Sequence, residues 1–155
     1  MSEYVATVEW NRGEQSFTDN RYSRGHEWHF DGGQTVPASS SPHVVPLPYS
    51  VEANVDPEEA FVAALSSCHM LFFLSFAATE GFCVDHYKDP ALGTMAKDES
   101  GITVMTEVRL RPEIIFVGDA PSEQQLKALH DKAHHHCFLA NSVKFPVVVN
   151  DPACD

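Results

Sequence analysis

The longest apolar stretch of the chain lies near its centre. Residues 60–78 contain no charged side chain, and signals for a helix start and a helix end flank them. Asp56 can accept hydrogen bonds from the free N–H groups of a first turn, and Pro57 suits the first helical position. Gly81 can adopt the left-handed conformation that ends many helices. The pattern predicts a helix from Asp56 to Gly81 that is apolar on all sides and therefore buried in protein.

This central helix is also long enough to raise the question of a membrane span. Its uncharged run extends about 28 Å at ~1.5 Å per residue. Ser66, Ser67 and His69 interrupt the centre of the run, and neither end carries Lys or Arg. We therefore expect no membrane partner. A chain of 155 residues is small for surrounding such a helix, which favours a second copy of the chain as part of its cover.

Strand patterns with a period of two residues stand on both sides of the central helix. A second helix is expected from Ser122, where Gln125 completes a capping box and an apolar stripe follows. The predicted strands cover residues 4–10, 15–18, 23–30, 83–87, 93–97, 102–116 and 145–149, with an ordered loop at 35–52. This order predicts a single α+β domain over residues 1–155, with antiparallel β-sheets wrapped around the long buried helix and the second helix beside it.

Composition and charge narrow the range of partners. The chain is 43% apolar and 21% charged, as in globular proteins, and its formal charge is −12. That charge argues against nucleic acid or an anionic membrane surface as a partner. The first residues alternate between polar and apolar and do not form a basic, then apolar, export signal. We therefore expect a cytoplasmic protein, in which the four cysteines do not form a disulfide framework.

Two of the cysteines stand at the two predicted helices. Cys68 lies inside the central helix, and Cys137 lies just beyond the end of the second helix. Each is open to two interpretations: a buried apolar filler, or one member of an attacking and resolving thiol pair. The spacing in the sequence does not show whether the two thiols meet.

The other histidines and cysteines favour structural roles. Side chains of consecutive helical residues point about 100° apart, so those of His134–His136 and Cys137 do not converge on one ion, and we expect no metal or other cofactor. His69 follows Cys68 on a different helical face and is expected to be a hydrogen-bonded core histidine. Cys83 is expected to fill a strand, and Cys154 to be exposed in the tail.

Two segments resemble known family motifs. The run from Asp56 to Cys68, DPEEAFVAALSSC, resembles the signature helix of the OsmC/Ohr family of thiol peroxidases, which reduce organic hydroperoxides. The run from Ala133 to Cys137, followed by Asn141, resembles the second-cysteine region of that family. The order of strands and helices matches along nearly the whole chain. One departure is Phe138, because family members often have proline after the second cysteine.

The resemblance implies a role for several side chains. Cys68 would attack the peroxide, and Cys137 would resolve the sulfenic acid as a Cys68–Cys137 disulfide. Glu58 matches the family glutamate at the helix start. Arg24 fits best the family arginine that stabilises the thiolate and binds peroxide oxygens, ahead of Arg21 and Arg12. The apolar side chains expected to select alkyl or lipid hydroperoxides over hydrogen peroxide are Phe61, Leu65, Phe72 and Phe73.

Helix geometry adds an expectation about assembly. Glu58 and Cys68 are ten residues apart on one helix, hence about 15 Å along its axis. One arginine would reach both more easily if two central helices packed antiparallel in an intertwined homodimer, an assembly that the resemblance also implies. In the family a lipoyl-type dithiol is the reductant. The alternative is a non-catalytic protein that binds or senses a hydrophobic or electrophilic small molecule on the same fold.

Overall fold

The computed structural model describes residues 1–153, so Cys154 lies outside the described part. The chain forms two compact units, residues 1–60 and residues 61–155. A single domain over residues 1–155 stays a prediction.

The N-terminal unit contains a three-stranded antiparallel sheet. Its strands are β1 (Ala6–Glu9), β2 (His26–Phe30) and β3 (Thr35–Ala38), paired in that order. β3 lies in the segment 35–52 that the sequence predicts as a loop; Pro37 falls within the strand, and an edge strand tolerates a proline. The strand predicted at residues 15–18 is absent from the described strands. Instead, Phe17 stacks on Tyr22 with 4.7 Å between ring centroids, which holds this stretch as a packed turn.

Helix α1 (Pro57–Thr79) begins and ends where the sequence predicts. The Glu59 N–H donates to Asp56 Oδ1 at 2.8 Å, and the Asp56 N–H donates to Glu59 Oε1 at 2.8 Å. This reciprocal pair is a capping box. At the other end Gly81 has a φ of 87°, the left-handed conformation that glycine adopts without strain.

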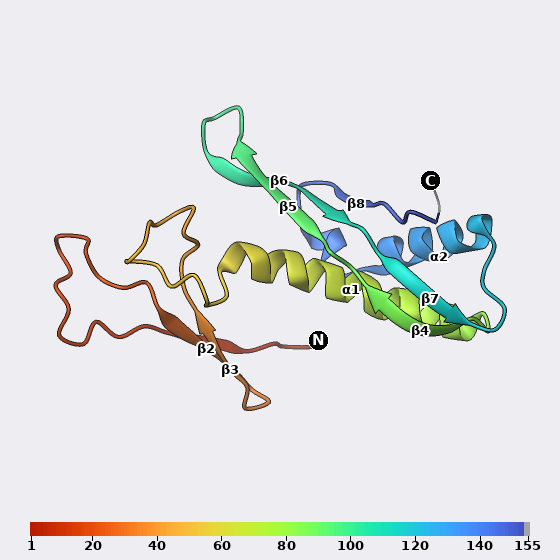
Figure 1. The fold of residues 1–155 in the computed structure, drawn as a ribbon, viewed down its shortest axis with the longest axis horizontal. Coiled ribbons are helices and arrows are strands. Elements are labelled where there is room, and N and C mark those ends of the chain that lie inside the picture. The colour runs from red at the N-terminus through yellow and green to blue at the C-terminus, as the bar shows by residue number, and fades with distance from the viewer. Residues whose placement is uncertain (154–155) are drawn as a thin grey trace. The chain divides into compact units, whose positions relative to one another are not determined.

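The C-terminal unit contains two further sheets. β4 (Cys83–Lys88) pairs antiparallel with β7 (Glu113–Val117). β5 (Leu92–Lys97) pairs antiparallel with β6 (Thr103–Leu110), and β8 (Val147–Val149) joins the other edge of β6 in parallel (Figure 1). The predicted strand 102–116 is thus two strands in different sheets. Pro112 lies at the break, where the Arg111 N–H donates to Asp89 Oδ1 at 2.7 Å instead of to a neighbouring strand.

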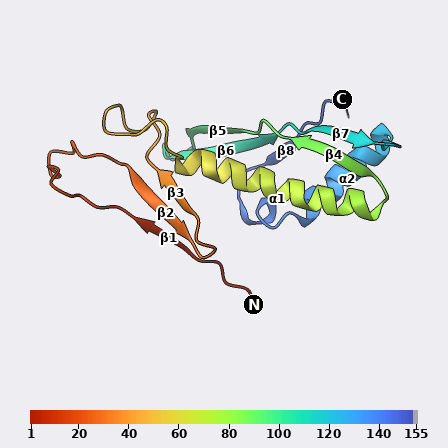
Figure 2. The same ribbon diagram turned by 60° about the horizontal axis from the view of Figure 1, so that its bottom comes forward.

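Helix α2 (Glu123–His136) starts at the predicted capping box between Ser122 and Gln125. It lies beside the second half of α1 and runs antiparallel to it (Figure 2). One core cluster joins the two helices through Phe73, Ala77, Leu126, Leu129 and Ala133. A second cluster packs Leu65 of α1 against Val108 and Leu110 of β6. A short 3₁₀ turn (Ala140–Ser142) follows α2.

The single chain buries only one stripe of α1. Its buried residues are Leu65, His69, Phe73 and Ala77, which recur every fourth position. Leu71, by contrast, is 61% exposed. The expectation that α1 is buried on all sides is therefore wrong for one chain alone. By length and composition α1 could cross a membrane, but the core helices of soluble proteins pass the same test.

Candidate active site

The structure brings Cys68 and Cys137 together. Cys68 is half-buried on α1, while Cys137 is 1% exposed at the C-terminal end of α2. The Cys137 thiol is hydrogen-bonded to Cys68, and this contact raises the pKa of Cys137. Both thiols are free. Two cysteines 69 positions apart therefore form a pair that can close into a disulfide.

The turn after α2 fixes the position of Cys137. The Cys137 N–H closes the last helical turn on Ala133 O at 2.9 Å. The Asn141 side-chain amide then donates to His135 O at 2.9 Å and to Cys137 O at 3.0 Å, which satisfies carbonyls that the helix end leaves free. The Ala140 N–H points at Cys137 Sγ from 3.4 Å. Asn141 thus holds the backbone that carries the second thiol.

Burial makes Cys137 a weak acid. Loss of solvent, and then the hydrogen bond to Cys68, raise the pKa of the Cys137 thiol from 9.0 to about 11. The Ala140 N–H acts in the opposite direction, because it would stabilise a thiolate. At neutral pH Cys137 is therefore a protonated thiol.

Aromatic side chains flank the two sulfurs. Phe72 follows Cys68 by one helical turn, and Phe138 follows Cys137 directly. Their rings meet edge to face with centroids 5.0 Å apart. Phe138 is 70% exposed, so this aromatic contact faces solvent. The segments that carry the two cysteines therefore share an aromatic contact that solvent reaches.

The other residues predicted to contact the substrate, Phe61, Leu65 and Phe73, pack against other parts of the molecule. Phe61 is partly exposed and meets Phe145 edge to face at 5.8 Å. Leu65 is fully buried in the core with Val108 and Leu110. Phe73, also expected near the substrate, is fully buried between the helices. Leu65 and Phe73 are therefore unfavourable as substrate contacts, because side chains that are fully buried in the core do not line an open site.

The predicted arginine and glutamate are not paired within residues 1–153. The Arg24 guanidinium donates to Asn20 Oδ1 at 2.7 Å and lies 3.8 Å above the Tyr22 ring. Arg21 donates to the Tyr49 hydroxyl at 2.9 Å, and Arg12 donates to Gln15 O at 2.7 Å.

Glu58 presents a polar atom that lacks a partner. Its Oε2 is buried and has no hydrogen-bond partner among the described residues. A buried carboxylate oxygen without a donor is costly. A guanidinium would satisfy it, which is the chemistry that the family resemblance assigns to this position.

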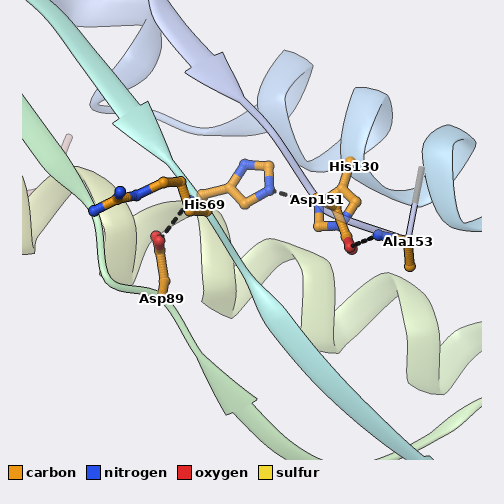
Figure 3. A network of polar contacts seen from close by, with 6 residues as sticks. His69, Asp89, His130, Asp151 and Ala153 are labelled. Carbon is orange, nitrogen blue, oxygen red and sulfur yellow. Dashed lines mark hydrogen bonds and ion pairs between the residues drawn. The ribbon is translucent and has the colours of Figure 1, made fainter. Parts of the chain in front are cut away.

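Of the histidines and cysteines expected to be structural, His69 has the predicted place in the core and Cys83 does not. His69 is 1% exposed and bonds His130 at 3.0 Å, which confirms it as a hydrogen-bonded core histidine (Figure 3). Its partner His130 lies 61 positions away, and His130 in turn bonds Asp151; no local pattern in the sequence indicates either contact. Cys83 is exposed and does not fill the core. Within residues 1–153 no three His, Cys, Asp or Glu side chains are grouped to hold a metal ion.

Fold and cysteine pair together define the class of protein. The chain belongs to the OsmC family, described as OsmC-like protein, whose pattern matches residues 51–150. It is also similar to a solved OsmC-like protein of unknown function from Vibrio cholerae, with 56% identity and a TM-score of 0.95 over 97% of this chain and 99% of the other. None of the curated proteins compared matches this chain.

More distant solved structures share the fold. An organic hydroperoxide resistance protein OsmC from Legionella pneumophila is 14% identical, with a TM-score of 0.69 over 97% of this chain and 96% of that one. The organic hydroperoxide resistance protein OhrB of Bacillus subtilis is 18% identical, with a TM-score of 0.62 over 97% and 96%. The predicted α+β class and OsmC/Ohr membership are thereby confirmed.

Proposed function

We propose that this protein is a thiol-dependent peroxidase that reduces organic hydroperoxides. The observation that carries the proposal is the hydrogen bond between Cys137 and Cys68, which joins two thiols from different helices. Membership of a family that includes organic hydroperoxide resistance proteins supports the same reaction class. The exposed Phe138 against Phe72 offers an alkyl or aryl peroxide an apolar contact beside the sulfurs.

The reaction proceeds in three balanced steps. The Cys68 thiolate attacks the terminal peroxide oxygen, the O–O bond breaks, and the alkoxide takes a proton and leaves as the alcohol. Cys68 is then a sulfenic acid. The Cys137 sulfur attacks the Cys68 sulfur, the S–O bond breaks, and the hydroxide leaves as water with the Cys137 proton. An external dithiol, of the lipoyl type in the proposal, reduces the disulfide by exchange and is itself oxidised to a disulfide.

Glu58 and an arginine complete the proposed site. The buried Oε2 of Glu58 would accept from a guanidinium, with Arg24 as first candidate and Arg21 and Arg12 behind it. The guanidinium would stabilise the Cys68 thiolate and bind the peroxide oxygens. No metal or cofactor takes part in the proposed steps.

A homodimer is part of the same proposal. Most of α1 is apolar, yet a single chain buries only four of its residues. Leu71 and Phe61 are exposed large apolar side chains on this helix. A second copy packed along α1 would remove this surface from water. We also propose a reducing, cytoplasmic location, where both thiols stay free between turnovers, and neither nucleic acid nor a membrane as a partner.

Stopped-flow measurement of thiol consumption tests the function. We expect reduced protein to consume cumene hydroperoxide at least about tenfold faster than hydrogen peroxide. Cys68→Ser should be inert, and the matched control Cys83→Ser, which removes an exposed thiol outside the pair, should react like wild type. Equal slow reaction of wild type and Cys68→Ser would refute a peroxidase.

The raised pKa of Cys137 favours a second candidate. A thiol with a pKa of about 11 forms little thiolate at neutral pH, which suits a protein that binds or senses a hydrophobic electrophile through Cys68 alone. Such a protein would form a stable Cys68 adduct and no disulfide under turnover conditions.

A further inference from the structure

A buried chain of three polar side chains runs beside the cysteine pair and has no part in the proposed thiol chemistry. His69 on α1 bonds His130 on α2, with 3.0 Å between His69 Nε2 and His130 Nδ1. His130 Nε2 lies 2.9 Å from Asp151 Oδ2, just after β8. The three residues are 1%, 4% and 5% exposed. Figure 3 shows them in line, with the Ala153 N–H donating to the other oxygen of Asp151 at 2.8 Å.

The Asp151 carboxylate determines which atom donates in its hydrogen bond with His130. A carboxylate only accepts, so His130 Nε2 carries the hydrogen that it donates to Asp151. With both rings neutral, His130 Nδ1 accepts from His69 Nε2–H. The two ring planes differ by 9°, so the hydrogen bond lies in the plane of the accepting ring. Burial, and then His130, lower the pKa of His69 from 6.5 to about 3, which keeps His69 neutral as this arrangement requires.

The hydrogen bond joins the same two helices as the cysteine pair. His69 is the residue after Cys68. His130 precedes Cys137 by seven residues, about two turns, so both project from one face of α2. The helices thus have two directional side-chain contacts here, one between imidazoles and one between thiols. Closer to the surface, Lys132 on α2 also pairs with Glu80, just after α1, with 3.6 Å between Nζ and Oε1. The remaining buried contacts between the helices are apolar, and apolar burial does not by itself specify a register.

The register matters because a disulfide has a narrow geometric range. Cysteine Cα atoms must approach to about 4.4–6.8 Å, whereas one helical turn spans about 5.4 Å. Sliding of α2 along α1 by one turn would therefore separate the sulfurs. It would also leave the polar atoms of His69 and His130 buried and unpaired, which is unfavourable. Phe73, stacked on His130 at 4.5 Å, fills the remaining space beside the ring.

We propose that His69, His130 and Asp151 are positioning residues that hold α1 and α2 in the register in which Cys137 reaches Cys68. The inference rests on the proposed function only in so far as the disulfide is catalytic. Its direct consequence is a property of the disulfide itself. Loss of the register lowers the effective concentration of one thiol at the other, so the disulfide closes more slowly and is reduced more easily.

Two variants break the hydrogen-bonded row of His69, His130 and Asp151, and one variant preserves it. His69→Leu keeps most of the volume and removes the donor. Asp151→Asn replaces an acceptor oxygen with an amide that faces a donor. His69→Gln keeps an N–H near the position of Nε2 and should rescue. Leu126→Ala is the control, because it loosens the apolar contact between the same helices without removing the polar chain.

The first readout is the reduction potential of the Cys68–Cys137 disulfide in defined mixtures of reduced and oxidised dithiothreitol, which needs no hydroperoxide. We expect His69→Leu and Asp151→Asn to raise it by about 30 mV, the equivalent of a tenfold weaker disulfide. His69→Gln should stay near wild type. Circular dichroism and thermal melting compare the stabilities of all variants. Leu126→Ala should be less stable than wild type, and its disulfide should keep the wild-type reduction potential.

The second readout is single-turnover closure after cumene hydroperoxide. His69→Leu should form the sulfenic acid at the wild-type rate and close the disulfide at least about tenfold more slowly. Unchanged potentials in His69→Leu and Asp151→Asn, or an equal shift in Leu126→Ala, would overturn the inference. If potentials shift while wild type is inert to hydroperoxide, the positioning role stands and the proposed peroxidase function fails.

Discussion

The pH dependence of disulfide closure follows from the buried state of Cys137. Its pKa is about 11 against an ordinary 9.0, because burial and the bond to Cys68 favour the thiol. Burial is the larger cause. A pKa of about 11 gives, at pH 7, a thiolate fraction about a hundredfold below that of an unperturbed thiol, because each pKa unit is a factor of ten. Closure through the Cys137 thiolate should be correspondingly slow.

The rate should also rise with pH in a particular way. Below the pKa the thiolate fraction grows about tenfold per pH unit, so closure should still accelerate between pH 9 and pH 10.5. An ordinary thiol would already level off near pH 9. The assay mixes reduced protein with one equivalent of cumene hydroperoxide at a series of pH values, and dimedone traps the sulfenic acid that has not closed.

The control is the first step, followed as thiol loss in Cys137→Ser, which lacks the resolving thiol and should not share this profile. Far-ultraviolet circular dichroism checks that the fold persists at each pH. A closure rate that levels off near pH 9, or that does not change with pH, would refute the role assigned to burial of Cys137.

Three further predictions address the aromatic flank, the buried histidine and the exposed helix. Phe138→Ala should lower the ratio of kcat/KM for cumene hydroperoxide to kcat/KM for hydrogen peroxide by about tenfold, because it removes one apolar contact with the substrate. The folded-state pKa of His69, about 3, lies below the ordinary 6.5, so stability should fall as pH drops from 6.5 toward 3. His69→Gln should flatten that fall in urea titrations, and an unchanged slope would contradict it. Leu71→Asp should shift the protein toward monomer in light scattering, since Leu71 is 61% exposed on one chain.

Local signals in the sequence located most elements. The capping residues Asp56 and Ser122 marked both helix starts, and Gly81 marked the end of α1, because these signals act through their immediate neighbours. The sequence predicts strands less well where contacts with distant segments determine whether a strand forms and which sheet it joins. Pro37 concealed an edge strand, and Pro112 divides one predicted strand between two sheets.

The site was predictable in its residues but not in its contacts. The patterns around Cys68 and Cys137 singled out both thiols, yet only the packing of α2 on α1 shows that they meet. His130 and Asp151 carried no local signal at all, since their hydrogen bonds span 61 and 21 positions. Leu65 was expected at the substrate, but its helical face points to β6.

Intact-mass analysis after one turnover tests the central claim most directly. Reduced wild type is treated with one equivalent of cumene hydroperoxide, quenched with an alkylating agent and digested for peptide mapping. Before alkylation, oxidised wild type should be lighter than the reduced protein by two hydrogens, and the peptide map should link Cys68 and Cys137 in one disulfide-bonded pair. Cys137→Ser should instead gain one oxygen on Cys68. Oxidation that spares Cys68, or a wild-type product without the Cys68–Cys137 link, would contradict the claim.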